Sequence, residues 1–343
     1  MRALGSLWIL LFCAGHLSYA QAPMKVIFDT DMGSDCDDVG ALAYLHSLAD
    51  LGKVKILACV YSSGKVPYGA GIIQAINEYY GRGSVPVGAY QQQDVGDSID
   101  KMDAKRLASD TSRYGHSIIL NSQAESHTSV VRRILAHPSN DKVVYITVGH
   151  TKGLYDVLTS LPDDHSRWSG DEMIKNKVSK WVALGALKAD QRGAAKDWNF
   201  FFNGTAPFTQ YLVENFPKPI YYVSAGTDVM TGSSLVSLPK GVIVRDAYES
   251  WLWWYGNKTL QDQRPSWDLA CVYYAVNGEG EFLKNMGTGS LDFDAEEGCS
   301  WIPGKESKPE QYYVIEKPGI TQDFADYFNK MISKKPKHNS LTH

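Results

Sequence analysis

Five aspartates lie within ten residues near the start of the chain, directly after a short apolar run. They are Asp29, Asp31, Asp35, Asp37 and Asp38. No lysine or arginine lies within this segment, so its negative charges repel one another and destabilise it. A hard divalent cation such as Ca²⁺ would relieve the repulsion, because it prefers carboxylate and carbonyl oxygens as ligands. The alternative is a solvated acidic turn in which Asp37 or Asp38 caps the following helix.

Two other acidic templates fit the segment less well. An EF-hand loop needs acids at alternate positions, a glycine at the sixth position and a glutamate at the twelfth, and no starting aspartate here supplies all of them. A strand followed by Asp-x-Asp also opens the haloacid-dehalogenase-like phosphatases, in which the first aspartate is the nucleophile. Those enzymes carry threonine or valine where this chain has Gly33, so a phosphatase is the less favoured alternative.

Short β-branched or aromatic runs alternate with longer amphipathic segments along the chain. Strands are predicted at Lys25–Phe28, Val54–Tyr61, Val143–Val148, Trp181–Leu184 and Ile220–Val223. Helices are predicted at Val39–Leu51, Ala70–Tyr80, Val130–His137, Ala206–Phe216 and Leu269–Val276. This alternation predicts an α/β fold, a single large domain with a mostly parallel central sheet and helices on both faces. In such sheets ligands bind beyond the carboxyl ends of the strands, where the acidic segment lies.

The first twenty residues have the features of a secretory signal peptide. Arg2 precedes the apolar stretch Leu7–Phe12, and Ser18–Ala20 forms a small-x-small cleavage site. The sequence therefore predicts a signal peptide at 1–20, a globular domain at 21–335 and a flexible basic tail at 336–343. The predicted location is secreted or periplasmic.

Charge and hydropathy exclude two classes of partner. The chain has 34 Lys+Arg against 38 Asp+Glu, a formal net charge of −4, and its basic run near the C-terminus is typical of a solvated tail. No segment after residue 20 is long and apolar enough to span a bilayer. We therefore expect the mature protein to bind neither nucleic acid nor membrane. Cys36 is predicted to be a packing residue, and the pairing of the other cysteines is left open.

The motif Asp29-Thr30-Asp31-Met32-Gly33, followed by Asp37-Asp38, resembles the N-terminal motif of the nucleoside hydrolases, the inosine/uridine-preferring nucleoside N-ribohydrolase family. Three later segments continue the resemblance in the same order, so that it spans nearly the whole mature chain. They are Thr147–Leu154, Lys196–Phe200 with Asn203 and Ala206, and Ser266-Trp267-Asp268. The domain at 21–335 is accordingly expected to be nucleoside-hydrolase-like.

The resemblance implies a Ca²⁺ ion that also binds the ribose hydroxyls and a water. Its implied ligands are Asp31, Asp38, Asp268 and the main-chain carbonyl of Lys152. Asp31 is then the general base that activates the water. The implied ribose contacts are Asp37, Asp197 and Asn199, and the long spacing after Gly33 leaves open whether Asp35 or Asp37 touches the sugar. Because the family commonly forms dimers or tetramers, a homo-oligomer is also compatible with the resemblance.

Departures from the family pattern bear on the leaving base. Lys65 stands where many relatives carry a ribose-binding asparagine, and Trp267 stands where many carry a histidine that protonates the base. An indole cannot deliver that proton, but it can stack on a purine, so Trp267 favours purine nucleosides. His150 is a second candidate for contact with the leaving base. The aromatic run at residues 251–255 either walls a base pocket or fills a core.

Two functional hypotheses follow. The first is a secreted Ca²⁺-dependent hydrolase that cleaves the N-glycosidic bond of a purine-leaning nucleoside, or a related N-riboside, to free base and ribose. The second is a catalytically weak homologue that binds a sugar-like ligand. The presence of Asp31, Asp38, Asn199 and Asp268 favours the hydrolase, whereas Lys65 and Trp267 favour divergence.

Overall fold

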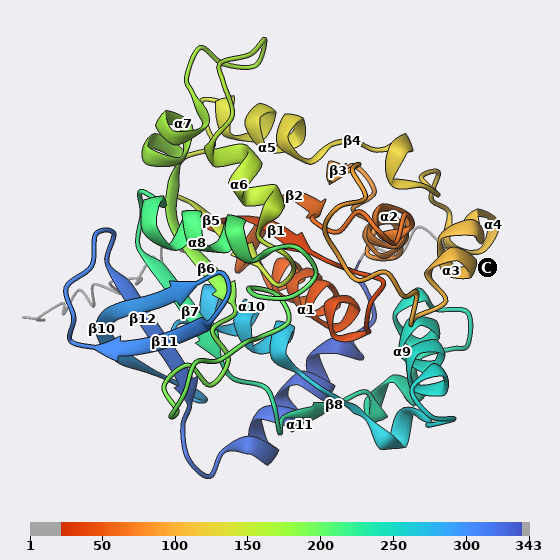
Figure 1. Ribbon diagram of the computed structural model, residues 1–343. Helices are drawn as coiled ribbons and strands as arrows, with labels where there is room; N and C mark the ends of the chain where they lie inside the picture. Colours follow the sequence, from red (N-terminus) through yellow and green to blue (C-terminus); the bar gives the residue numbers. More distant parts are fainter. Residues whose placement is uncertain (1–21, 338–343) are drawn as a thin grey trace, which may run out of the picture.

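The computed structural model describes residues 22–337 and places a ten-stranded sheet at the centre of the molecule (Figure 1). Its strands are β1 (Met24–Thr30), β2 (Val54–Tyr61), β3 (Val87–Ala89), β4 (Glu125–Ser126), β5 (Val143–Thr147), β6 (Val178–Leu184), β7 (Ile220–Ser224), β10 (Leu283–Asp294), β11 (Gly298–Pro303) and β12 (Gln311–Glu316). A separate two-stranded sheet pairs β8 (Met230–Thr231) with β9 (Arg264–Pro265). The predicted signal peptide lies outside the described residues and stays a prediction.

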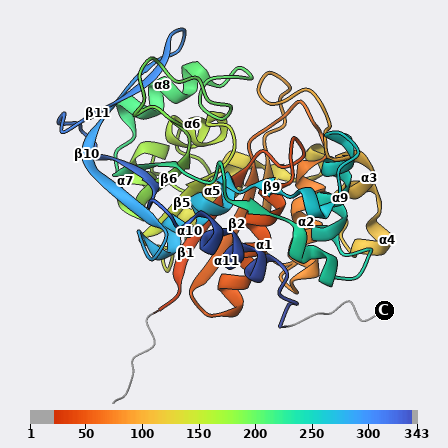
Figure 2. The same ribbon diagram turned by 90° about the horizontal axis from the view of Figure 1, so that it is seen from below.

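The central sheet has the strand order β11-β10-β12-β7-β6-β5-β1-β2-β3-β4. All neighbours from β12 to β4 run parallel, while β10 pairs antiparallel with both β11 and β12. Seen from below, β10 and β11 extend at one end of the molecule, and α2, α3 and α9, whose bounds follow, lie at the other (Figure 2). The predicted mostly parallel sheet is confirmed, with an antiparallel hairpin added at one edge.

Helices cover both faces of the sheet. They are α1 (Asp37–Asp50), α2 (Gly69–Tyr79), α3 (Ala104–Ser109), α4 (Thr111–Tyr114), α5 (His127–Ala136), α6 (Lys152–Leu158), α7 (Gly170–Lys177), α8 (Ala206–Asn215), α9 (Ile243–Trp254), α10 (Trp267–Asn277) and α11 (Thr321–Ile332), with 3-10 turns η1 (Asn121–Gln123), η2 (Ser233–Ser237) and η3 (Leu260–Asp262). Side chains of α1, α2, α9, α10 and α11 form one hydrophobic core, and those of α5, α6, α7 and α8 form the other. The predicted helices on both faces are therefore confirmed.

The central strands are apolar on both sides because a core lies on each face. Along β1, Val26 and Phe28 point into the first core, whereas Ile27 points into the second. This is the pattern of a strand buried in a parallel sheet. The helix α1 is buried almost along its whole length, since it lies between the sheet and the helices α10 and α11.

The four described cysteines are Cys36, Cys59, Cys271 and Cys299, and all four are buried and free. The prediction that Cys36 is a packing residue is confirmed. Within residues 22–337, we find no helix that combines the length and the apolar character needed to cross a bilayer.

Candidate active site

A cavity of about 410 Å³ opens beyond the carboxyl ends of the parallel strands, where this class of sheet places its ligands. Residues after β1, β5 and β6 meet there with residues from α9 and from the start of α10. The lining side chains are Asp31, Ser34, Asp35, Asp37, Asp38, Asp97, Lys101, Val148, Leu184, Leu187, Asp197, Trp198, Asn199, Trp251, Trp254, Tyr255, Arg264, Trp267 and Asp268. The fold thus unites the acidic segment with the later motifs.

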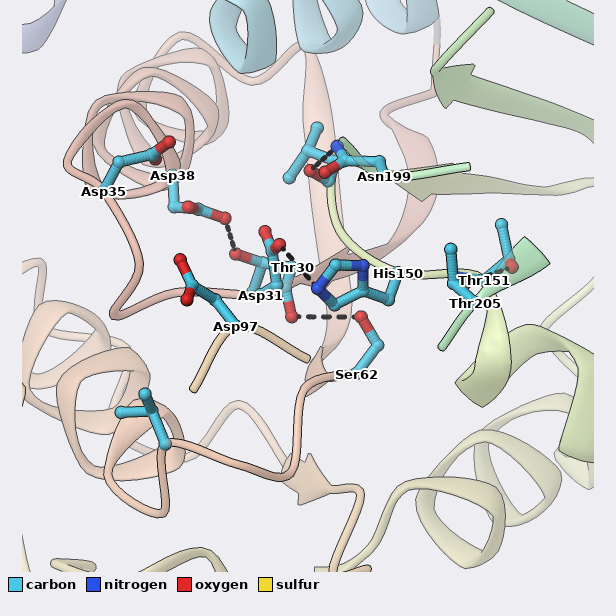
Figure 3. A network of polar contacts seen from close by, with 12 residues as sticks. Thr30, Asp31, Asp35, Asp38, Ser62, Asp97, His150, Thr151, Asn199 and Thr205 are labelled. Carbon is cyan, nitrogen blue, oxygen red and sulfur yellow. Dashed lines mark hydrogen bonds and ion pairs between the residues drawn. The ribbon is translucent and has the colours of Figure 1, made fainter. Parts of the chain in front are cut away.

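Three carboxylates in this cavity are placed to share a cation. One oxygen from each of Asp35, Asp38 and Asp268 lies within 4.8 Å of the others. Asp38 stands in the first turn of α1 and Asp268 in the first turn of α10, so two helix N-termini point their positive ends at the cluster. The side chains of Asp35, Asp38 and Asp31 lie close to one another in Figure 3.

Burial and mutual repulsion disfavour the ionised state of these carboxylates. Burial, followed by the charge of Asp35, raises the pKa of Asp31 well above its ordinary value. Burial also raises the pKa of Asp38 and Asp268, and neighbouring aspartates add to both shifts. Such a cluster of hard oxygen donors with unbalanced negative charge fits a divalent cation.

Arg264 neutralises one side of the cluster. Its Nη2 lies 2.6 Å from Oδ2 of Asp35, and its Nε lies 3.1 Å from Oδ1 of Asp37. Burial opposes ionisation of Asp35, but the charge of Arg264, together with hydrogen bonds from Asp37 and Asp38 and the charge of Lys101, outweighs it and lowers the pKa of that carboxyl. In Asp37, burial and the charge of Asp35 prevail and raise the pKa to about 8.

Asp31 lies at the junction between β1 and β5. Its Oδ2 is 3.3 Å from Nε2 of His150, and the two side chains face each other in Figure 3. The preceding residue, Thr30, donates its hydroxyl to Asp38 and accepts at its carbonyl from the hydroxyl of Ser62 at 3.3 Å. These hydrogen bonds hold Thr30 in place, and with it the following residue Asp31, beside the carboxylate cluster.

Asp197 and Asn199 shape the loop that follows β6. The carboxylate of Asp197 accepts main-chain N–H bonds from Ala186, Asn199 and Phe200 at 2.7 to 3.1 Å. Asn199 donates its amide to the carbonyl of Val148 at 2.6 Å. Asp197 therefore stabilises the loop with its oxygens, while Asn199 lines the cavity at the end of β5.

Two predicted site residues do not line the cavity. Lys152, whose main-chain carbonyl was the predicted ligand, is the first residue of α6, and its side chain pairs with Asp156 at 2.6 Å, whereas Val148 lies in the lining. His150 is fully buried and does not line the cavity. Burial lowers the pKa of His150 to about 4, so it is neutral at physiological pH. His150 therefore contacts Asp31 and does not face the cavity.

Four rings form a surface that we call the aromatic wall: Trp251, Trp254, Tyr255 and Trp267. Trp251 and Tyr255 stack with ring centroids 4.8 Å apart, and Tyr255 is 56% exposed at the mouth. Of the aromatic run, Trp254 and Tyr255 therefore line the pocket, while Trp251 both lines the pocket and belongs to the hydrophobic core. Trp253 instead lies outside this cavity.

Sequence reasoning did not identify Asp97, Lys101 or Arg264 as lining residues. Asp97 and Lys101 form an ion pair at 2.7 Å in the loop after β3. That loop carries several aspartates without a distinguishing pattern. A lone arginine shortly before the Trp267-Asp268 motif was the available signal for Arg264, because an acidic site needs a counter-charge.

The fold is shared with known proteins, although neither a scan of protein-family models nor a search of curated proteins finds a match. Among solved structures, the chain is similar to an inosine-uridine preferring nucleoside hydrolase from Bacillus anthracis (13% identity, 90% of this chain and 99% of that chain, TM-score 0.60). It is also similar to a purine-preferring ribonucleoside hydrolase from Gardnerella vaginalis (16% identity, 90% and 98%, TM-score 0.61).

A third similar structure is the type III effector protein XopQ complexed with adenosine diphosphate ribose (14% identity, 92% of this chain and 94% of that chain, TM-score 0.61). These likenesses show that the chain has the nucleoside hydrolase fold. At such identities they establish the fold alone, so the activity must be argued from the site.

Proposed function

We propose that the protein is a Ca²⁺-dependent N-ribohydrolase that splits a purine-leaning nucleoside, or a related N-riboside, into free base and ribose. The observation that carries the proposal is the arrangement of the cavity. Asp31 and the group of Asp35, Asp38 and Asp268 occupy one part of it, and the aromatic wall occupies another. The solved structures named above as nucleoside hydrolases support the same reading.

The residues suited to hold the cation are Asp35, Asp38 and Asp268. When bound, the cation supplies positive charge that polarises a water and a sugar diol. Asp31 is the candidate general base because it lies beside the cluster and lines the cavity. A raised pKa keeps a carboxyl group protonated. A positive charge close to it lowers that pKa, so the ionised carboxylate can accept a proton at neutral pH.

The aromatic wall recognises the base. Trp267 donates its indole N–H to the hydroxyl of Thr227 at 3.0 Å, which fixes the plane of the ring. Flat rings held in this way stack on a planar base, and a purine offers them a larger face than a pyrimidine. The expected preference for purine nucleosides rests on this contact area.

The test is a panel of purine and pyrimidine nucleosides incubated with the purified protein in Ca²⁺ or in chelator, with release of base and reducing sugar measured. We expect purine nucleosides to be cleaved in Ca²⁺ and not in chelator. The variant Asp31→Asn should keep the fold and lose activity by roughly a hundred-fold to ten-thousand-fold, as for loss of a general base. Asp246→Asn is the matched control, because Asp246 is a buried carboxylate outside the cavity.

Silence across the whole panel in Ca²⁺ would contradict the hydrolase proposal. Binding of ribose or free base without turnover would then favour the catalytically weak homologue. An Asp31→Asn variant with full activity would remove Asp31 from the role of base.

A further inference from the structure

Arg264 lies against the aromatic wall. Its guanidinium carbon lies 4.3 Å from the ring centroid of Trp251 and 4.6 Å from that of Trp267, so two indoles pack against it. The edge formed by Nε and Nη2 is occupied by Asp37 and Asp35. Arg264 therefore joins the wall to the acidic segment through contacts that fix its orientation.

The Nη1 nitrogen of Arg264 is left for a ligand. No residue between 22 and 337 accepts a hydrogen bond from Nη1, while Nε and Nη2 both have carboxylate partners. Nη1 is not one of the fully buried polar atoms that lack a hydrogen-bond partner. Arg264 also lines the cavity. Since Nε and Nη2 are held by carboxylates, Nη1 is the nitrogen of this cavity-lining side chain that is available to a bound molecule.

Glycosidic cleavage creates a need for such a donor. Water oxygen bonds to the anomeric carbon, and the C–N bond breaks with its electron pair passing to the base nitrogen. The proton of the water passes to the carboxylate of Asp31, and the departing base takes a proton from solvent. Negative charge develops on the base before that protonation, and a fixed hydrogen-bond donor stabilises it.

Two other candidates for this task, His150 and Trp267, are less suited to it. His150 does not line the cavity. The indole N–H of Trp267 is already donated to Thr227. Arginine keeps its proton, so Arg264 cannot act as an acid, but it donates a charge-assisted hydrogen bond at any working pH.

We propose that Arg264 is a catalytic residue whose Nη1 donates a hydrogen bond to the leaving base, so that the site selects planar bases with an acceptor atom on their edge. This inference rests on the proposed hydrolase function and extends it to the leaving group. The ionised carboxylate of Asp35 offsets the charge of Arg264, which favours a neutral acceptor, such as a ring nitrogen or carbonyl oxygen, over an anion.

The test compares two substrates in Arg264→Met at saturating Ca²⁺. Inosine has a poor leaving group, whereas 4-nitrophenyl β-ribofuranoside has a leaving group that needs no assistance. We expect kcat/KM to fall by roughly a hundred-fold to a thousand-fold for inosine, as when one donor to a developing anion is removed. For the nitrophenyl riboside we expect a fall of less than about ten-fold, so the ratio of the two rates changes.

Both substrates share the cation and the sugar contacts, so a general disturbance of the acidic segment cancels in the ratio. The matched control is Arg245→Met, because Arg245 is as buried as Arg264 and pairs with Glu249 outside the cavity. It should leave the ratio unchanged. As a second readout, hypoxanthine binding followed by tryptophan fluorescence should weaken about ten-fold in Arg264→Met.

Equal losses on both substrates would overturn the inference and make Arg264 a structural counter-ion. If Arg264→Met fails to fold, Arg264→Lys is measured instead; it keeps the charge without the forked Nη1 and should change the ratio in the same direction. A wild-type enzyme that cleaves only the nitrophenyl riboside would also contradict the inference. A wild-type enzyme that cleaves neither substrate would refute the proposed function first, and the role of Arg264 with it.

Discussion

At the scale of single residues, the site is defined by an imbalance of charge. Seven aspartates line the cavity, and two cations, Lys101 and Arg264, stand among them. Each cation is already paired with a carboxylate. In the absence of a divalent ion, part of the cluster must therefore hold protons at neutral pH.

This protonation gives the ion-free protein a pH-dependent stability. Burial, followed by the charge of Asp35, raises the pKa of Asp37 to about 8, so the folded protein keeps a proton that the unfolded chain has released above about pH 4. The stability contributed by protonated Asp37 is complete below that pH and is lost as pH rises toward 8. In chelator, the melting temperature of the wild type should therefore fall more steeply between pH 5 and 8 than that of Asp37→Asn. Parallel curves would contradict the assignment.

The sequence predicted which residue types form the site, but it did not predict where all of these residues lie in the structure. Asp31, Asp38 and Asp268 were predicted from their motifs, and the structure brings all three to one cavity. A main-chain ligand has no side-chain signature, so the carbonyl was assigned to Lys152 although Val148 lines the cavity. The burial of His150 depends on tertiary packing, which the sequence does not reveal.

At the scale of elements, the site depends on how closely β1 and β5 approach at their carboxyl ends. Thr147 is the last residue of β5 to pair with β1, and Val148 still donates its N–H to the carbonyl of Asp29 at 2.8 Å. A Cβ on Gly149 would lie 2.4 Å from the main-chain nitrogen of Asp31. The absence of a side chain at position 149 therefore sets the place of Asp31.

The variant Gly149→Ala tests this contact. Because the clash is with main chain, we expect a loss of roughly 1 to 3 kcal/mol in the free energy of unfolding. A displaced Asp31 should also lower base release at saturating Ca²⁺. Gly83→Ala is the control, since the nearest atoms to a Cβ there belong to the flexible carboxylate of Glu78. Equal denaturant midpoints for wild type and Gly149→Ala would contradict the expectation.

Sequence patterns predicted several of the strands and helices correctly. The five predicted strands and five predicted helices occur in the structure, with boundaries that differ by three residues or fewer. The strands β10, β11 and β12 were not predicted. The first half of β10 has few apolar residues, and its pairing depends on tertiary contacts with β12 and β11. Its second half alternates buried Leu291 and Phe293 with exposed aspartates, a strand pattern that the sequence analysis missed.

At the scale of the whole molecule, the proposed cation would connect distant parts of the chain. Asp38 lies in the first turn of α1 and Asp268 in the first turn of α10, and their oxygens meet in one cluster. A ligand that binds this cluster in the folded state stabilises the fold by mass action.

Added Ca²⁺ should therefore raise the melting temperature. At a free concentration one hundred times the Kd, the gain in the free energy of unfolding is about 2.7 kcal/mol. The measurement is a thermal melt in chelator and in increasing Ca²⁺, with Mg²⁺ as a comparison. Asp268→Asn should abolish most of the response. A melting temperature that is the same in Ca²⁺ and in chelator would remove support for the cation site.

The four enclosed thiols make local opening of the molecule measurable. Burial raises the pKa of each thiol, so alkylating reagents should react slowly with the native protein. Cys36 lies in the acidic segment, whereas Cys299 lies on the edge strand β11. Comparing their modification rates by mass spectrometry would separate fluctuations of the ligand pocket from fraying of the sheet, without introducing a probe into the chain.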